Sequence, residues 1–403
     1  MVTSPPATDP DGLPRLPFRQ PDLLEVPPEA LDLQARCPVS RVRTPTGDTA
    51  WLVTGYDEVR RVYADDRFGM SHRSPQTAPR LGASLLLGGP NGDFDTQPAE
   101  RLKARARLAP YFSPKRMRAF RPRVEALTES MLAAIEAAGP PADLHADLSV
   151  RLPVTVICEL LGVDERDRYR FREWTQGVAD VSDRERSLTA LTELMSFTQD
   201  LVARKRAEPG NDVISALCRD EDGTIPDGYI AFLAAMLLFA GHETTVVRLD
   251  HAILLMLAHP DQRTAAFAEP GRLAPAVEEI LRVVVHGGVR ETLRWAREDV
   301  PLGDVTIGDG DLVVLYSAAA NRDAQVFGNP CEFDVSRPPR PHVTLGFGAH
   351  YCLGAPLVRM ELEAVLSRIF TRFPGLHLTV PMDRLEARRE VLTGGLAALP
   401  VAW

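Results

Sequence analysis

The chain has 403 residues, of which 45% are hydrophobic and 25% charged, as in an ordinary globular protein. Its 46 Lys and Arg residues face 55 Asp and Glu residues, and the formal net charge is −9. Because sequence-independent binding to nucleic acid requires a basic surface, no nucleic-acid partner is expected. The five cysteines are widely spaced and odd in number, which excludes a disulfide framework. No two of them have the CxxC spacing of a thiolate zinc site.

The N-terminal segment has no basic stretch followed by an apolar core, the pattern of a secretory signal. The longest apolar run, residues 230–241, is shorter than the ~20 residues needed to span a bilayer. We therefore expect a cytoplasmic protein without a membrane segment.

The chain begins with irregular structure and continues mainly as helix. Residues 1–30 are rich in Pro and Asp and are expected to lie over the surface. Residues 50–54 predict a strand, which the helical pattern YDEVRRVYAD follows, and residues 68–98 form a long irregular segment rich in Gly, Pro and Ser.

Beyond this segment the helical period dominates, and strand-like pieces such as DVTIGDG and DLVVLYS cluster late. A last strand pair is expected near 376–380 and 391–402. The pattern predicts a mainly α protein with small β-sheets (α+β), in a single domain over residues 1–403. The predicted helices are 100–137, 151–179, 187–207, 227–258, 273–284 and 355–373.

A glycine-rich loop, LGFGAHYCLG at residues 345–354, holds Cys352 immediately before an amphipathic helix. Glycine allows positive φ angles and close backbone approach. The unpaired N–H groups and the dipole at a helix N-terminus favour a thiolate over a thiol. A thiolate on such a loop is a good axial ligand for haem iron. The alternative is a buried cysteine in a glycine-rich turn, and the loop taken alone favours the ligand only modestly.

The long predicted helix begins near Asp227 and is stopped by Pro260, and its centre reads AGHETT. Gly241 and two threonines are poor helix formers in a buried position, so a kink or bulge that makes room for a ligand is expected here. A threonine that bonds to the carbonyl one turn earlier is the simpler explanation. It leaves the charged Glu243 in an apolar stretch unexplained, because buried carboxylates are costly without a partner.

Glu279 and Arg282 lie three residues apart in AVEEILR, so they share one helix face and can form an ion pair. The simplest interpretation is a solvated pair on the surface of the helix.

Together these segments resemble the motifs of cytochromes P450. The cysteine loop is similar to the haem-binding signature FGxGxHxCxG, with Leu345 in place of the leading aromatic residue. The segment AGHETT resembles the acid–alcohol motif, and Glu279 with Arg282 resembles the ExxR motif. The motifs follow the family's order over nearly the whole chain, so the chain looks like a soluble actinomycete P450 of secondary metabolism and is expected to have the P450 fold.

The resemblance implies specific roles around haem b. Cys352 would be the iron ligand, with the other signature residues Phe347, Gly348, His350 and Gly354 around it. Ala240 and Gly241 would form an oxygen groove, and Glu243 and Thr244 would relay protons to dioxygen. Arg105, Arg294 and His342 match the propionate-binding residues of the family, and Arg101 stands where many members have His. Arg337 would complete a structural network with Glu279 and Arg282. His242 stands at the variable position of its motif and is expected to serve helix packing or a surface contact.

The resemblance also implies a haem-thiolate monooxygenase that uses O2 to hydroxylate a small organic substrate. No fused flavin domain is expected after residue 403, so the two electrons are expected from NAD(P)H through a ferredoxin reductase and a ferredoxin. A basic run offers a docking face for an acidic ferredoxin, although a solvated helix face without a partner is equally compatible with it. We expect a monomer whose substrate is free or bound to a carrier or peptide. The docking residues would be Arg101, Lys103, Arg107, Lys115 and Arg116.

The substrate contacts are expected in 68–98, in the helices around 164–205, in the central helix before Ala240 and in 284–289. His286 and Arg290 are polar groups that could orient the substrate. Oxidative coupling or desaturation of an aromatic or peptidic substrate is the alternative reaction. A haem-binding protein without turnover and a haem-free helical protein are the remaining alternatives, and the complete acid–alcohol pair argues against the first of them.

Overall fold

The computed structural model describes residues 11–84, 87–180, 183–219, 225–285, 292–388 and 394–403. The chain divides into two compact units. The first unit contains Met1–Arg101, Ala258–Cys352 and Ala387–Gly394, and the second contains Leu102–Leu257, Leu353–Glu386 and Gly395–Trp403. The single domain over 1–403 stays a prediction.

The described part of the chain is mainly helical, as predicted. The α-helices are α1 (Pro28–Arg36), α2 (Tyr56–Ala64), α3 (Gln97–Leu108), α4 (Pro114–Ala138), α5 (Arg151–Leu161), α6 (Arg168–Ala179), α7 (Arg184–Ala207), α8 (Val213–Cys218), α9 (Asp227–Ala258), α10 (Pro260–Phe267), α11 (Leu273–Val283), α12 (Ser317–Ala320) and α13 (Ala355–Arg372). Shorter turns of helix are η1 (Ala109–Phe112), η2 (His145–Ser149), η3 (Glu165–Asp167), η4 (Gly348–His350) and η5 (Met382–Arg384).

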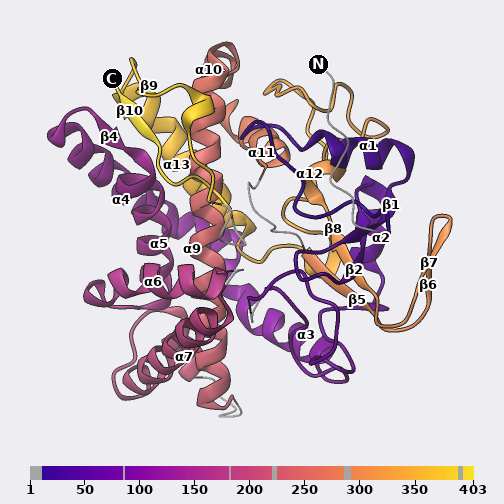
Figure 1. Ribbon diagram of the computed structural model, residues 1–403. Coiled ribbons are helices and arrows are strands. Elements are labelled where there is room, and N and C mark those ends of the chain that lie inside the picture. Colours follow the sequence, from indigo (N-terminus) through magenta and orange to yellow (C-terminus); the bar gives the residue numbers. More distant parts are fainter. Residues whose placement is uncertain (1–10, 85–86, 181–182, 220–224, 286–291, 389–393) are drawn as a thin grey trace. The chain divides into compact units, whose positions relative to one another are not determined.

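The first unit contains a five-stranded sheet of order β1-β2-β8-β5-β3. Strands β2, β8 and β5 are labelled side by side in Figure 1. Strands β2 and β8 are parallel and the other neighbours are antiparallel. Apolar side chains from the sheet and from α2, including Val53, Val59 and Leu315, share one buried core. The strands are β1 (Val39–Arg43), β2 (Thr49–Val53), β3 (Phe68–Gly69), β5 (Thr292–Ala296) and β8 (Leu312–Leu315), beside the separate hairpin β6 (Val300–Leu302) and β7 (Val305–Ile307).

The second unit is a group of helices in which α9 lies beside α5 and α6 (Figure 1). Its apolar core joins side chains of α5, α6, α7, α8 and α9, for example Ile157, Phe171 and Leu238. Gly241 permits the close approach of α9 to α5, because a Cβ atom there would lie 2.9 Å from the Ile157 side chain. A small sheet of β4 (Ala142–Asp143), β9 (His377–Leu378) and β10 (Pro400–Ala402) completes the unit.

Most predicted elements are present, but two predicted helices are broken, and the helices α1, α8, α10 and α12 were not predicted. The predicted helix 100–137 is broken at Ala109–Phe112, and 151–179 is broken near Glu165–Asp167. The first break is followed by Ser113 and by Pro114, the first residue of α4. The second break lies after Gly162, whose positive φ angle of +73° ends α5. Periodicity alone did not separate these helices, because both members of each pair are amphipathic.

Helix α9 ends at Ala258, two residues before Pro260, as predicted. By length and composition it is apolar enough to cross a membrane, but 67% of its most apolar stretch is buried inside the structure. A mostly buried helix of this kind is typical of a protein core. Of the kink or bulge expected at residues 240–245, the bulge is wrong, because the helix continues without interruption through this segment. The kink stays a prediction.

Candidate haem site

The cysteine loop of the first unit is built on two glycines with positive φ angles, Gly346 (+77°) and Gly348 (+58°). A Cβ atom on Gly346 would lie 2.5 Å from the carbonyl oxygen of His350, so only glycine fits there without a backbone shift. The Cys352 N–H donates to the carbonyl of Leu345 at 2.7 Å and closes the loop. Cys352 itself is exposed, so its thiol is accessible to a ligand.

Neighbouring side chains of the same unit hold the cysteine loop in place. The Arg60 guanidinium lies 4.3 Å from the centre of the Phe347 ring, and Arg101 donates a hydrogen bond of 2.9 Å to the carbonyl of Ala349. The His350 ring lies 6.1 Å from the ring of Tyr63. Leu345 is buried, so the position that carries an aromatic ring in the resembled signature is filled by an apolar side chain. A single exposed thiolate on such a loop suits iron whose other ligands come from a porphyrin.

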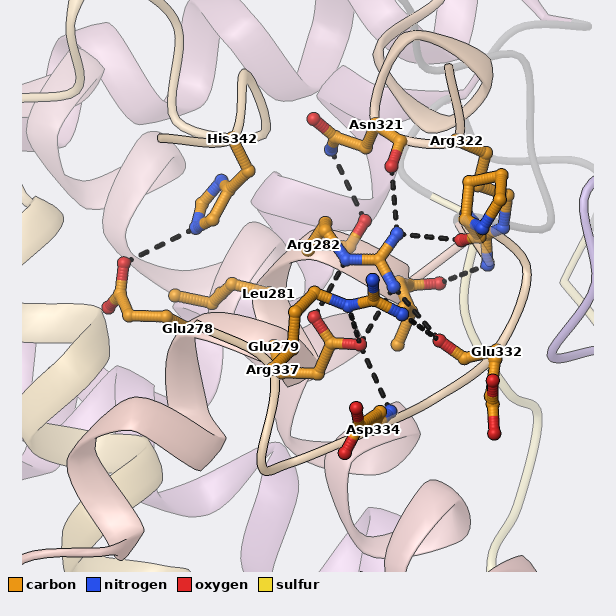
Figure 2. A network of polar contacts seen from close by, with 12 residues as sticks. Glu278, Glu279, Leu281, Arg282, Asn321, Arg322, Glu332, Asp334, Arg337 and His342 are labelled. Carbon is orange, nitrogen blue, oxygen red and sulfur yellow. Dashed lines mark hydrogen bonds and ion pairs between the residues drawn. The ribbon is translucent and has the colours of Figure 1, made fainter. Parts of the chain in front are cut away.

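Glu279, Arg282 and Arg337 form a buried network in the first unit, shown in Figure 2. Arg282 makes two bonds of 2.7 Å to the Glu279 carboxylate, a bidentate ion pair. Arg337 reaches the same carboxylate at 3.2 Å. The solvated surface pair is therefore wrong for Glu279 and Arg282, which are 5% and 2% exposed.

The remaining donors of Arg282 are also satisfied, and they connect α11 to distant segments. They donate to the carbonyls of Asn321, Pro330 and Glu332 at 2.7 to 3.0 Å. Such a saturated guanidinium fixes several loops at once. The network is consistent with a structural role.

Asn321 extends this network toward the cysteine loop. Its side chain accepts from the N–H of Val343 at 2.8 Å and donates to the Thr344 hydroxyl at 2.7 Å, and Thr344 in turn donates to the carbonyl of Leu281. The buried Asn321 thus links α11 to the residues that lead into the loop. Figure 2 shows the hydrogen bonds between Asn321 and Arg282. Sequence reasoning missed it, although a polar residue after the apolar run of SAAANRD was a signal.

Arg294 on β5 is a buried guanidinium, 2% exposed, with few partners. It donates to the carbonyl of Leu293 at 2.7 Å and lies 5.4 Å from the Tyr63 ring, while its Nε has no hydrogen-bond partner. No carboxylate of the described residues forms an ion pair with it. Burial, together with the nearby positive charge of Arg101, lowers the pKa of Arg294 to about 10, so the side chain is still charged at neutral pH. A buried cation near a second cation is suited to an anion such as a haem propionate.

His342, the second predicted propionate ligand in the first unit, is buried as well. Its Nε2 lies 3.4 Å from the Glu278 carboxylate, and neither ring nitrogen makes a hydrogen bond within the described structure. Sequence reasoning did not foresee the neighbouring carboxylate. The third ligand, Arg105, lies on the α3 portion of the second unit and is half-buried.

Helix α9 of the second unit carries the acid–alcohol segment. Ala240 is exposed and Met236, Gly241 and Thr244 are half-buried on a helix whose other faces are mostly buried, so these residues form an open strip. The Thr244 hydroxyl donates to the carbonyl of Ala240 at 2.8 Å, and Thr245 makes the same bond to Gly241 at 3.2 Å. Both threonines therefore bond one turn back, and the open strip is apolar enough to face a porphyrin.

Glu243 points away from that strip into the core of the second unit. It is 2% exposed, and its Oε1 lies 3.4 Å from the Thr175 hydroxyl of α6 and 3.7 Å from Nδ1 of His242. The buried Glu243 carboxylate thus has polar neighbours. They explain how a charged residue can be buried in this apolar stretch of sequence. Thr175 lay outside every predicted motif, so its part in this cluster was missed.

The basic side chains proposed for ferredoxin docking divide into two sets. Lys103, Lys115 and Arg116 are exposed, whereas Arg101 and Arg107 are half-buried. Arg107 lies 5.7 Å from the ring of Tyr229. His286 and Arg290 lie outside the described residues, and so does the larger part of 284–289.

Comparison with known proteins gives a consistent result. The family model described as cytochrome P450 matches residues 182–393. The pentalenolactone synthase of Streptomyces exfoliatus is 42% identical over 399 residues, which cover 97% of this chain and 99% of the relative.

Two solved structures show the same likeness. The polyene macrolide pimaricin epoxidase PimD is 39% identical with a TM-score of 0.87, covering 97% of this chain and 99% of that one. A cytochrome P450mel 107F1 with biaryl coupling reactivity is 35% identical with a TM-score of 0.86, covering 96% and 99%. The predicted α+β fold is confirmed by these neighbours.

Proposed function

Because the chain belongs to the cytochrome P450 family, we propose that Cys352 is the thiolate ligand of a haem b. The protein is a haem-thiolate monooxygenase of natural-product chemistry, with dioxygen as co-substrate and electrons supplied through a ferredoxin. The observation that carries the Cys352 assignment is the exposed thiol on a loop that two positive-φ glycines shape. When bound, haem supplies the activation of dioxygen and the transfer of one oxygen atom to the substrate.

The other predicted site residues bind the haem propionates or support the cysteine loop. Arg294, Arg101, Arg105 and His342 neutralise the propionates, and the unsatisfied Nε of the buried Arg294 supports this assignment. The remaining signature residues shape the loop around the ligand: Phe347, Gly348, His350 and Gly354. Glu279, Arg282 and Arg337 hold the segments that lead into the loop.

The proton supply is assigned to Thr244 and Glu243. The Thr244 hydroxyl donates its proton to the Ala240 carbonyl at 2.8 Å. Because Thr244 is only half-buried, this hydroxyl can rotate and donate toward the open side of the helix. Glu243 Oε1 holds the proton that replaces it. Ala240 and Gly241 leave the strip beside Thr244 open, as an oxygen groove requires.

The test of the ligand is the absorption spectrum of the dithionite-reduced, CO-saturated protein. The wild type should show the red-shifted Soret band that gives the family its name, and Cys352→Ser should lose it. Cys331→Ser is the matched control, since Cys331 is also exposed. Retention of the band in Cys352→Ser would contradict the assignment.

Oxidative coupling or desaturation is the second candidate reaction, favoured by the likeness to the structure with biaryl coupling reactivity. The mass of the product separates the reactions. Hydroxylation adds one oxygen atom, whereas coupling and desaturation remove two hydrogen atoms.

The ferredoxin is proposed to dock on Lys103, Lys115 and Arg116, with Arg101 and Arg107 at the edge of this basic face. Lys115→Glu with Arg116→Glu should slow electron transfer from a reduced acidic ferredoxin most strongly at low salt. Arg36→Glu, another exposed basic side chain, is the control. An equal loss in both variants would contradict a specific docking face. A cytoplasmic, monomeric protein remains part of this proposal.

A further inference from the structure

A buried polar cluster surrounds the Glu243 carboxylate within the second unit. Thr175 on α6 and His242 and Glu243 on α9 are all at most 2% exposed. The Thr175 Oγ1 lies 3.2 Å from Nδ1 of His242, 3.4 Å from Oε1 of Glu243 and 2.9 Å from the carbonyl oxygen of Phe171. Three potential partners thus meet at one hydroxyl group.

The number of protons restricts how this cluster can bond. A hydroxyl has one proton to donate and two lone pairs that accept. The Phe171 carbonyl and an ionised Glu243 carboxylate are both acceptors, so they compete for the single Thr175 proton. When either oxygen receives that proton, His242 Nδ1 bonds to a lone pair of Thr175 and is the donor. A proton on Nδ1 of His242 leaves the Thr175 proton for one of the two oxygens, whereas an unprotonated Nδ1 would be a third acceptor that competes for it.

We propose that Thr175 is a positioning residue whose hydroxyl follows the charge of Glu243. When Glu243 is ionised, the Thr175 proton turns to its Oε1. When Glu243 carries a proton on Oε1, the Thr175 proton turns to the Phe171 carbonyl, and the Thr175 oxygen accepts from Glu243. His242 donates to the Thr175 oxygen in both states.

This arrangement lets Glu243 lose and regain a proton without a movement of α6 or α9. Burying an ionised carboxylate without a donor costs free energy, and the rotation of one hydroxyl offsets that cost in the charged state. The proton that Glu243 releases is replaced by one from water, so no electrons are exchanged. The inference rests on the proposed function, in which Glu243 supplies protons.

The first test measures which ring nitrogen of His242 carries the proton. The 15N chemical shifts of the histidine rings are measured in the reduced, CO-saturated protein, and the His242 signal is identified by its loss in His242→Gln. The wild type and Thr175→Ser should show the Nδ1–H tautomer, and Thr175→Val should shift His242 toward Nε2–H. A wild-type ring protonated on Nε2 alone, or no change in Thr175→Val, would overturn the proposal.

The second test follows proton delivery, with dioxygen and reduced ferredoxin as the only reactants. We measure the ratio of hydrogen peroxide to water formed, in H2O and in D2O. Loss of one hydrogen bond to a charged group should raise this ratio roughly tenfold in Thr175→Val and increase its solvent isotope effect. Thr175→Ser should keep the wild-type values. Thr198→Val is the control, because Thr198 is a buried threonine that bonds to Met195 on another helix, α7.

Glu243→Gln separates the inference from the proposed function. If it raises the peroxide ratio while Thr175→Val does not, the role of Thr175 is wrong and the proton supply by Glu243 stands. If Glu243→Gln leaves the ratio unchanged, both are wrong.

Discussion

Two arginines of the first unit have the same burial and opposite surroundings. Arg282 and Arg294 are each 2% exposed. Arg282 makes five hydrogen bonds to one carboxylate and three carbonyls, whereas Arg294 has an Nε without a partner and no ion pair with a described residue. The saturated guanidinium is complete within the protein. The unsaturated one has the properties of a site that an external anion completes.

Glu361 on α13 of the second unit shows why the sign of the charge matters. It is fully buried with an Oε2 that has no hydrogen-bond partner, and burial raises its pKa well above the ordinary value. A carboxyl group can therefore remain neutral by keeping its proton. A guanidinium stays charged at neutral pH, so an unsatisfied buried arginine indicates a ligand more strongly than an unsatisfied buried glutamate does.

The largest expected effect comes from replacing Arg282, the arginine whose hydrogen-bond donors are all satisfied within the protein. Arg282→Met leaves the Glu279 carboxylate buried with one guanidinium fewer, and should lower the free energy of unfolding by about 3–5 kcal/mol. Urea unfolding monitored by circular dichroism measures this loss. The double variant Arg282→Met/Glu279→Leu should recover part of it, and a double variant less stable than Arg282→Met would contradict the ion-pair explanation.

Replacement of Arg294, the arginine with the unsatisfied Nε, should not lower the stability of the haem-free protein. Arg294→Met removes a buried charge that forms no ion pair with a described residue, so the haem-free protein should be as stable as the wild type or more stable. The haem should dissociate roughly 10-fold to 100-fold faster, because a charge-assisted hydrogen bond to a propionate is lost.

Transfer of haem to an excess of apomyoglobin measures this rate, and thermal unfolding measures the stability. Arg297→Met, at a half-buried arginine three residues along the chain, is the control. A large loss of apoprotein stability in Arg294→Met would show that Arg294 is structural, like Arg282.

The smallest expected effect comes from replacing Glu361, whose carboxyl group is buried. The folded-state pKa of Glu361 lies above the unfolded value, so the folded state holds an extra proton and its stability falls as pH rises above about 4.5. Glu361→Gln removes this dependence and should raise the melting temperature at neutral pH. The gain should disappear below pH 4.5, where the carboxyl is protonated in both states. Melting curves between pH 4 and pH 8 check this, and an equal gain at every pH would contradict it.

The sequence by itself determined the elements with strong local signals. Helix α9 ends where Pro260 requires it, and the Gly346 and Gly348 turns follow from residues that tolerate positive φ angles. The spacing of Glu279 and Arg282 was enough to predict their pairing, because three residues place two side chains on one helix face. The order of these motifs was enough to predict the family.

Only the tertiary structure decided what surrounds these residues. Burial of the Glu279 pair, the bonds of Asn321 to the cysteine-loop segment and the contact of Thr175 with Glu243 join positions far apart in the chain. Local periodicity carries no information about such contacts, because they depend on which helix faces pack together. The same physical reason separates Arg282 from Arg294: the sequence shows two arginines, and the packing decides which one has its partners within the protein.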